Sequence, residues 1–165
     1  MATNSDSRGS EKAEGQEVGR KSHSVPLSEL YRVAYSQLDC SRAKYSGFRV
    51  GAALLSDGKI FPGCNVENSS YGLTICAERS AVMHWASAGS PGNPEVIVVV
   101  AKNSAGELVT AMPCGACRQV LSDLPGSNLL QVYTGEGEKM VKATLPELLP
   151  HAFGPDDLSS YGGDR

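Results

Sequence analysis

The sequence lacks the features that would place the protein in a membrane or on nucleic acid. Its 165 residues contain no stretch approaching the roughly 18 consecutive apolar residues of a membrane span. The N-terminus has no apolar segment of about 7–15 residues, which a signal peptide requires. Lys and Arg number 15 against 18 Asp and Glu, and this formal net charge of -3 gives little basis for binding a phosphate backbone. We therefore expect a cytoplasmic protein with no nucleic-acid or membrane partner.

Histidine is scarce and the number of cysteines is odd. His23, His84 and His151 have no partner motif, so we interpret all three as structural or solvated. Five cysteines fit a disulfide framework poorly in a chain of this kind. Metal binding, catalysis and burial are the roles that remain for them.

Apolar side chains are also scarce at the N-terminus. Residues 1–24 contain only four of them and no aromatic residue. Such a segment cannot bury enough surface to offset the entropy of ordering it, so we predict a disordered tail. The remaining length predicts one domain over residues 25–158. Residues 159–165 are expected to form a flexible C-terminal tail.

Helical and strand-like patterns alternate along this domain. Apolar spacing predicts helices over 27–38, 75–88, 113–124 and 145–149. Strands are predicted over 50–56, 59–66, 96–100, 129–134 and 139–144, with Asp57-Gly58 as a hairpin turn between the first two. The run VIVVV at 96–100 is typical of a central strand that is covered on both faces. The pattern predicts an α/β fold, a three-layer α-β-α sandwich with a five-stranded mixed sheet and helices on both faces.

Three cysteines stand at the starts of predicted helices. Cys114 and Cys117 form a Cys-x-x-Cys pair behind Pro113, and Cys76 lies 38 residues upstream. Helix N-termini favour thiolate over thiol, and three thiolates can hold Zn²⁺ while leaving a fourth position for water. A lone Cys-x-x-Cys is also a redox motif or half of a four-cysteine structural zinc site. Cys40 and Cys64 lack this spacing and are interpreted as core or surface thiols.

Glu78 favours the catalytic interpretation. Cys-Ala-Glu followed by Pro-Cys-x-x-Cys matches the known three-cysteine form of the zinc deaminase signature. A carboxylate in the first turn of the helix can reach a zinc-bound water without being a ligand, and can shuttle its proton to a substrate. The alternative is that Glu78 is an acid that only complements the helix N-terminus.

Two arginines follow the ligand-bearing turns. Three thiolates and a hydroxide leave excess negative charge around a divalent ion, which would blunt its ability to acidify water. Arg79 and Arg118 are the candidates to draw this charge off through hydrogen bonds to sulfur. Either one can instead be a plain surface charge.

These motifs resemble the small, homotetrameric cytidine deaminases. The resemblance spans about residues 27–158 in order, and residues 1–24 lie outside it. The segments that carry it are YSGFRVGAA at 45–53, GCNVEN at 63–68, YGLTICAER at 71–79, PCGACRQV at 113–120, LPELLP at 145–150 and FGPDDL at 153–158.

The resemblance implies zinc-dependent hydrolytic deamination of cytidine and 2′-deoxycytidine to uridine and 2′-deoxyuridine, with one zinc ion per subunit. It also implies a homotetramer whose neighbouring subunits complete the active sites. Among the residues, it implies zinc ligation by Cys76, Cys114 and Cys117 and proton shuttling by Glu78.

The resemblance also assigns roles in substrate binding. The N–H of Ala77 is implied to bind the pyrimidine carbonyl, and Phe48 to pack on the base. Asn65 and Glu67 match the pair that holds the ribose 3′-hydroxyl, and their i, i+2 spacing fits one face of a strand. Phe153 is expected to reach a neighbouring subunit's site, and Tyr71 to meet an adjacent protomer. As plain sequence features, Phe48, Tyr71 and Phe153 fit core or interface positions equally well.

Several alternatives to the cytidine deaminase hypothesis remain open. Polynucleotide deaminases usually carry histidine at the position of Cys76, and a carboxylate at Glu67 would repel a 3′-phosphate. A nucleoside-antibiotic deaminase would lack the full Asn-x-Glu-Asn run at 65–68. A structural zinc module predicts that Glu78 is dispensable, and a redox protein predicts a reversible Cys114–Cys117 disulfide.

Overall fold

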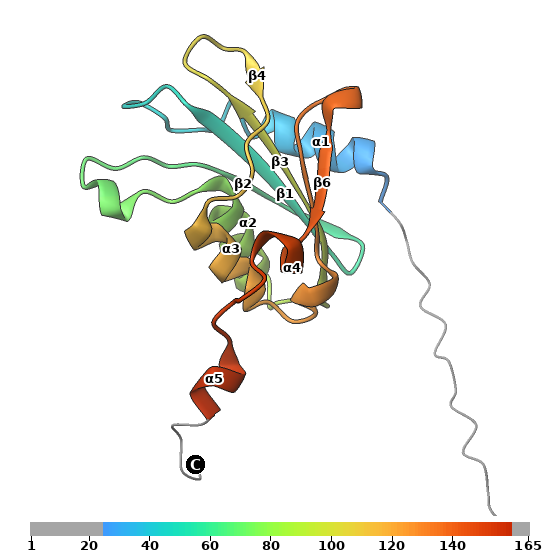
Figure 1. Cartoon of the computed structure of the whole chain (residues 1–165). Coiled ribbons are helices and arrows are strands. Elements are labelled where there is room, and N and C mark those ends of the chain that lie inside the picture. Colours follow the sequence, from blue (N-terminus) through green and yellow to red (C-terminus); the bar gives the residue numbers. More distant parts are fainter. Residues whose placement is uncertain (1–24, 160–165) are drawn as a thin grey trace, which may run out of the picture.

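The computed structural model describes residues 25–159, which form a mixed β-sheet flanked by helices (Figure 1). The tails expected at residues 1–24 and 160–165 lie outside the described residues. The helices are α1 (Leu27–Ser36), α2 (Ala77–Ser87), α3 (Gly115–Ser122), α4 (Leu145–Leu148) and α5 (Pro155–Ser159). The strands are β1 (Arg49–Ser56), β2 (Lys59–Cys64), β3 (Pro94–Lys102), β4 (Leu108–Val109), β5 (Gln131–Thr134) and β6 (Val141–Thr144). Short 3-10 turns occur at η1 (Tyr71–Leu73), η2 (Ser127–Leu129) and η3 (Gly137–Lys139).

The sheet has the order β2-β1-β3-β5-β6, with β4 paired to β3. Only the β3–β5 pair among these described strands is parallel; the other pairs are antiparallel. Asp57 and Gly58 both have positive φ in the turn that joins β1 and β2, which confirms the predicted hairpin. The sixth strand, β4, corrects the predicted five-stranded sheet. It has only two residues, too few to give a strand pattern in the sequence.

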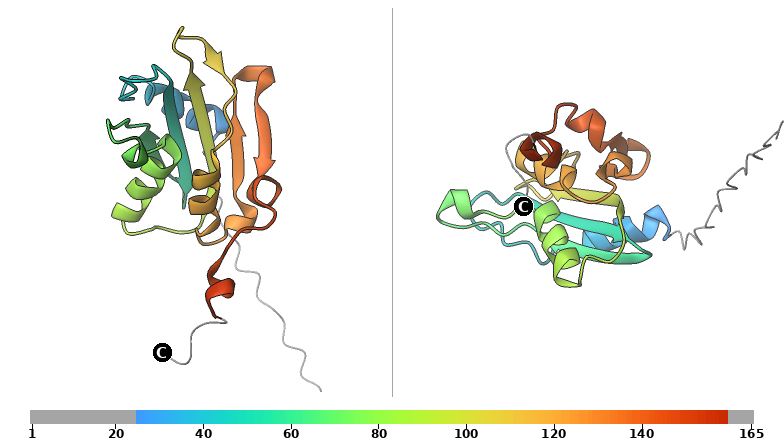
Figure 2. Two further views of the ribbon diagram at one scale, coloured as in Figure 1. Left: turned by 60° about the vertical axis from the view of Figure 1, so that its left-hand side comes forward. Right: turned by 90° about the horizontal axis from the view of Figure 1, so that it is seen from below.

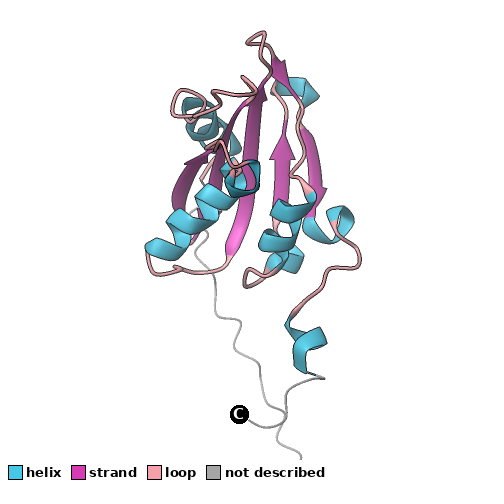
Figure 3. Ribbon diagram, turned by 90° about the vertical axis from the view of Figure 1, so that its left-hand side faces the viewer, coloured by secondary structure: helices cyan, strands magenta, loops and turns pink. Residues whose placement is uncertain are grey.

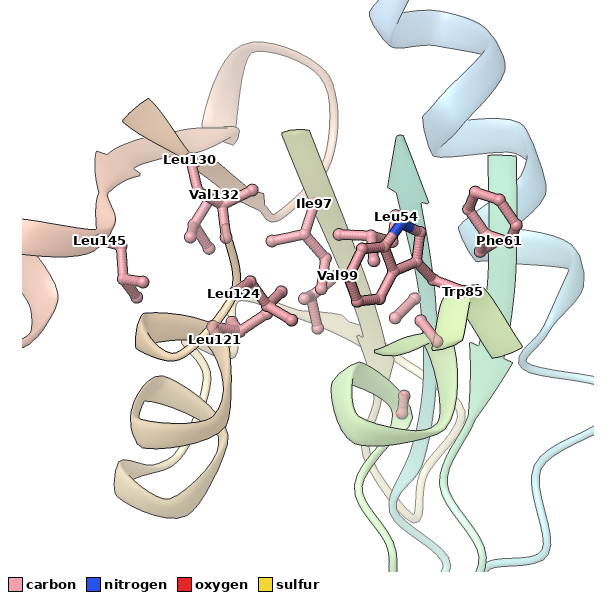
Figure 4. Packing of buried hydrophobic residues seen from close by; sticks show 13 residues of the cluster. Leu54, Phe61, Trp85, Ile97, Val99, Leu121, Leu124, Leu130, Val132 and Leu145 are labelled. Carbon is pink, nitrogen blue, oxygen red and sulfur yellow. The ribbon is translucent and has the colours of Figure 1, made fainter. Parts of the chain in front are cut away.

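Helices cover both faces of the sheet, which confirms the three layers (Figure 3). One core cluster joins the sheet to α2 and α3, with Trp85 and Leu121 among its members (Figure 4). A second joins the opposite face to α1 through Leu30 and Ala34. Alternate residues of β3 enter the two clusters, so its β-branched run is buried on both sides as expected. None of the helices within residues 25–159 is long and apolar enough to cross a membrane.

Two glycines allow the helices to approach the sheet closely. A Cβ built at Gly51 would lie 2.0 Å from the carbonyl oxygen of Ala34 in α1. A Cβ at Gly63 would lie 2.4 Å from the backbone nitrogen of Ala81 and 2.5 Å from the carbonyl oxygen of Ala77, both in α2. The missing side chain of Gly63 therefore determines how close the N-terminal turns of α2 lie to β2.

The C-terminal segment leaves the body of the domain after α4. A capping box begins α4, because the Glu147 carboxylate accepts hydrogen bonds from the backbone N–H of Thr144 at 2.7 Å and from its hydroxyl at 2.9 Å. Beyond it, α5 projects from the domain in Figures 1 and 2. The sequence analysis did not predict α5, which is only five residues long.

Candidate active site

Two helix N-termini bring three sulfur atoms together. Cys76 is the N-cap residue of α2 and Cys114 that of α3, and both have extended backbone angles. Cys117 lies one turn into α3 and is fully buried. The Sγ atoms of Cys76 and Cys114 are 3.9 Å apart, and those of Cys114 and Cys117 are 3.5 Å apart. The predicted placement of these cysteines at helix starts is confirmed.

This cluster has the geometry of a zinc site. Within residues 25–159, Cys76, Cys114 and Cys117 form the group whose ligand atoms all lie within 4.8 Å of one another. A tetrahedral zinc ion with Zn–S bonds of about 2.3 Å has sulfur–sulfur edges of about 3.8 Å. Three thiolates supply a soft donor set that suits zinc and disfavours magnesium and calcium. The residues therefore fit the ion.

The thiols of the cluster shift one another's pKa values. Hydrogen bonding with Cys117, assisted by Arg79 and Cys114, lowers the pKa of Cys76 to about 5. The same interaction with Cys76, together with burial, raises the pKa of Cys117. A lowered pKa favours the thiolate form of Cys76, which is the form that binds a metal ion.

Glu78 is buried beside this cluster. Only 5% of its surface is exposed, and it lies in the first turn of α2. Burial is the main cause that raises the pKa of its carboxyl, and the negative charge of Cys76 raises it further. Hydrogen bonding with the Cys117 thiol partly offsets these effects. A carboxyl whose pKa lies closer to neutrality can both take up and release a proton, as a general acid–base catalyst must.

Arg79 and Arg118 make different contacts. Nη2 of Arg79 lies 3.8 Å from the sulfur of Cys76 and donates to the carbonyl oxygen of Thr74 at 2.8 Å. Arg118 instead donates to the carbonyl oxygens of Pro113 at 2.8 Å and Leu148 at 2.9 Å. Arg79 thus supplies the expected cationic contact to sulfur. The hydrogen bonds of Arg118 brace the backbone before Cys114 against the end of α4.

Glu67 binds the loop that precedes β1. Its carboxylate accepts hydrogen bonds from the backbone N–H groups of Tyr45 at 2.7 Å and Ser46 at 3.2 Å, and from the Ser46 hydroxyl. The hydroxyl of Ser46 is the main cause that lowers the pKa of Glu67, so this side chain stays negatively charged at neutral pH. Ser46 in turn accepts a hydrogen bond from the backbone N–H of Phe48 at 2.9 Å.

Asn65 binds the same loop from the inside. Only 8% of its surface is exposed. Its Oδ1 accepts from the hydroxyl of Ser41 at 2.5 Å and from the N–H of Val50 at 2.9 Å, and its Nδ2 donates to the carbonyl of Phe48 at 2.8 Å. Asn65 and Glu67 therefore hold the segment that carries Phe48, a use the sequence analysis did not foresee.

A pocket of about 370 Å³ opens beside Glu67, within the usual range for small-molecule sites. The three cysteines and Glu78 do not line it, but Thr74 does, and the carbonyl oxygen of Thr74 accepts a hydrogen bond from Arg79. Sequence reasoning singled out Glu67 and Tyr71 but missed the others, although all lie in or beside the motifs that carried the resemblance. The lining residues are Tyr45, Ser46, Glu67, Asn68, Tyr71 and Thr74.

The remaining predicted residues lie at different depths. Ala77 is fully buried as the first residue of α2, where backbone N–H groups have no acceptor within the helix. Phe48 is half-buried, whereas Tyr71 is 77% exposed. Phe153 is 59% exposed and lines a separate hollow between α3 and the C-terminal segment, where its carbonyl accepts a hydrogen bond from Gln119 at 2.7 Å.

Comparison with known proteins identifies the family. Residues 26–130 match the cytidine and deoxycytidylate deaminase zinc-binding region. The chain belongs to this family. It is 44% identical to cytidine deaminase of Mycobacterium tuberculosis over 117 residues, covering 69% of this chain and 79% of the relative. Identity to cytidine deaminase of Halalkalibacterium halodurans is 43% over 132 residues, covering 79% of this chain and 96% of the relative.

A solved structure agrees with this assignment. The crystal structure of cytidine deaminase from Burkholderia pseudomallei superimposes with a TM-score of 0.70 at 41% sequence identity. The match covers 78% of this chain and all of that one. The zinc-binding region of the family includes all three cysteines of the sulfur cluster.

Proposed function

We propose that the protein catalyses the hydrolytic deamination of cytidine and 2′-deoxycytidine, giving uridine or 2′-deoxyuridine and ammonia. The observation that carries this proposal is the buried Glu78 carboxyl beside three converging sulfurs. A purely structural zinc site has no use for a buried carboxyl with a raised pKa. The cytidine deaminases at 43–44% identity support the choice of substrate.

Cys76, Cys114 and Cys117 would hold the zinc ion. When bound, the ion supplies Lewis acidity that lowers the pKa of a water molecule toward neutrality. Glu78 would accept a proton from the attacking water and pass it to the pyrimidine ring nitrogen. It would then carry a second proton, from the hydroxyl added to the ring carbon, to the leaving amine. Burial raises the pKa of this carboxyl, which makes its carboxylate a stronger base toward the water proton than an exposed glutamate would be.

Nearby groups can bind and orient the nucleoside. The N–H of Ala77, at the start of α2, can donate to the pyrimidine carbonyl. A carboxylate has about four acceptor sites, and within the described residues Glu67 uses three, which leaves room for a ribose 3′-hydroxyl. The Asn65 amide has two N–H groups and donates one to Phe48, so the other can serve the sugar. We assign Phe48 to packing on the base.

The charge of Glu67 disfavours substrates that carry a phosphate on the 3′ position. Because hydrogen bonding lowers its pKa, the side chain is a carboxylate at neutral pH and repels a 3′-phosphate. We expect cytidine 3′-monophosphate to be deaminated far more slowly than cytidine. Equal rates for the two compounds would contradict the assignment of Glu67 to the sugar pocket.

The proposed assembly is a homotetramer whose neighbouring subunits complete the sites. The exposed side chains of Tyr71 and Phe153 are the residues we assign to a neighbour's site. Analytical ultracentrifugation combined with activity assays tests this assembly. A fully active monomer would contradict it.

The deciding experiment compares Glu78→Gln with the parent protein. We expect Glu78→Gln to stay folded and to bind one zinc ion per chain, while kcat for cytidine falls by about 10²–10⁴-fold. The assay follows the fall in ultraviolet absorbance as cytidine becomes uridine, with zinc measured on the same sample. Glu95→Gln, at an exposed position of β3, is the matched control and should retain full activity. An active Glu78→Gln enzyme would instead favour the structural zinc module.

A further inference from the structure

Cys40 and Cys64 form a second thiol pair outside the zinc-binding cluster. The sulfur of Cys64, the last residue of β2, lies 3.5 Å from the carbonyl oxygen of Cys40. Neither residue takes part in the metal site or the catalytic steps proposed above. Both are free thiols in the structure.

A backbone bridge keeps the segments that carry the two cysteines close together. Arg42 and Val66 form a parallel bridge, in which the N–H of Arg42 donates to the carbonyl of Asn65 and the N–H of Glu67 donates to the carbonyl of Arg42, both at 3.0 Å. Cys40 and Cys64 each lie two residues before a member of this bridge. Cys40 itself lies in the turn that follows α1, and the sulfur of Cys64 reaches its carbonyl oxygen. The bridge and this contact keep the two residues adjacent, which is the first requirement for a disulfide.

The two thiols differ in accessibility. Cys40 is exposed, whereas Cys64 is half-buried. Burial and the neighbouring Cys40 raise the pKa of Cys64, so it remains a thiol at neutral pH. A small disulfide in solution therefore reaches Cys40 first, with Cys64 placed to react second.

The pair is linked to Asn65, one of the residues proposed to bind the sugar, through the two residues that follow the cysteines. Ser41 follows Cys40, and Asn65 follows Cys64. The hydroxyl of Ser41 donates to Oδ1 of Asn65 at 2.5 Å, and Asn65 also binds the backbone of Phe48. A disulfide between Cys40 and Cys64 would change the positions of these two residues. Because Ser41 and Asn65 follow them directly in the chain, their hydrogen bond would be disturbed.

We propose that Cys40 and Cys64 are a thiol–disulfide modification site, oxidised by a low-molecular-weight disulfide such as glutathione disulfide, and that closing it displaces Asn65. In the first step the thiolate of Cys40 attacks one sulfur of glutathione disulfide, forming a mixed disulfide and releasing one glutathione. Cys64 then loses its proton and attacks Sγ of Cys40, releasing the second glutathione. The protein loses two electrons and two protons, and one glutathione disulfide is reduced to two glutathione molecules.

Peptide mapping of the zinc-loaded full-length protein tests the chemistry. The protein is incubated with glutathione disulfide, free thiols are blocked with iodoacetamide, and the chain is cleaved with trypsin and then with a glutamate-specific protease. Trypsin alone leaves Cys64 and Cys76 together in residues 60–79, and cleavage after Glu67 separates them. We expect residues 33–42 joined to residues 60–67, in a species that runs as a monomer on a non-reducing gel. This linked peptide should be absent from Cys40→Ser and Cys64→Ser.

Enzyme kinetics test the connection with Asn65, and this arm rests on the proposed deaminase activity. Oxidation should raise KM for cytidine by about fivefold, the effect expected for losing a neutral hydrogen bond, with little change in kcat. Dithiothreitol should reverse the change, and Cys40→Ser should show none. Absence of the linked peptide, or a link to Cys76, Cys114 or Cys117, would overturn the modification site. A linked peptide with an unchanged KM would overturn the displacement of Asn65.

Discussion

Replacing Gly63 by alanine tests how the fold positions the candidate active site. Gly63 lies in β2 beneath the first turns of α2, which carry Ala77 and Glu78. A Cβ at this position would lie 2.4 Å from the backbone nitrogen of Ala81, whereas ordinary contacts begin at 3.4 Å. Because the clashing atoms belong to helix backbone, no side-chain rotation relieves the overlap. The N-terminus of α2 must therefore move away from the sheet by about 1 Å.

This movement should affect stability and catalysis separately. Overpacking of this kind costs about 1–3 kcal/mol, which corresponds to a fall of roughly 3–10 °C in the melting temperature. A shift of about 1 Å in a catalytic group can reduce the rate by about 10²-fold. We therefore expect Gly63→Ala to remain folded at 25 °C but to deaminate cytidine with a kcat lowered by about 10–100-fold.

Gly154→Ala is the matched control for this experiment. No heavy atom lies within 4 Å of a Cβ built at Gly154, and this residue does not have positive φ. Its melting temperature should equal that of the parent. Thermal unfolding by circular dichroism measures the stability of both variants, and the absorbance assay measures kcat for Gly63→Ala. A Gly63→Ala protein as stable and active as the parent would refute the close contact between β2 and α2.

Three further changes test other parts of the structure. Cys117→Ser removes a buried sulfur that we propose as a zinc ligand, and it should lower the zinc content of the purified protein well below one ion per chain; full retention would contradict this role. Thr144→Ala removes the capping hydroxyl of α4 and should lower the free energy of unfolding by about 0.5–2 kcal/mol in urea titrations. Hydrogen bonds from Thr144 lower the pKa of the Glu147 carboxyl in the folded protein. The ionised carboxylate therefore stabilises the folded state at pH values above the unfolded pKa of about 4.3. This effect is lost as the pH falls through the folded pKa. The stability difference between Glu147→Gln and the parent should therefore disappear on acidification, and a difference that persists at low pH would contradict this linkage.

The strongest local signals in the sequence predicted the fold correctly. Asp57-Gly58 specifies a hairpin because both residues accept positive φ, and the structure has that turn. The uninterrupted run at 96–100 requires cover on both faces, which α1 on one side and α2 with α3 on the other provide. The boundaries of the other predicted elements differ by at most two residues, in most cases because caps and turns replace the ends of the predicted helices and strands.

Features that depend on tertiary contacts could not be predicted in the same way. The pairing of β4 rests on two residues that meet the end of β3 after a turn held by Asn103, whose Oδ1 accepts from the N–H of Ala105 at 3.0 Å. The hydrogen-bond partners of Arg118 are carbonyl oxygens, one of them on α4. The position of Arg118 next to Cys117 in the sequence predicted a contact with sulfur and gave no reason to expect these partners. Sequence position identifies a guanidinium near a site, whereas its hydrogen-bond acceptors are fixed only by packing.

Asn65 and Glu67 show how one sequence pattern serves both fold and proposed function. Their i, i+2 spacing predicted a shared face, but the same carboxylate and amide also bind the backbone of residues 45–50. A substitution at either position would therefore disturb the loop that carries Phe48 as well as remove a proposed contact with the sugar. Because the loop is held by the groups proposed to receive the ribose, substrate binding and loop order should be coupled. Loss of substrate affinity at these positions therefore measures the combined effect and not the strength of a single hydrogen bond to the substrate.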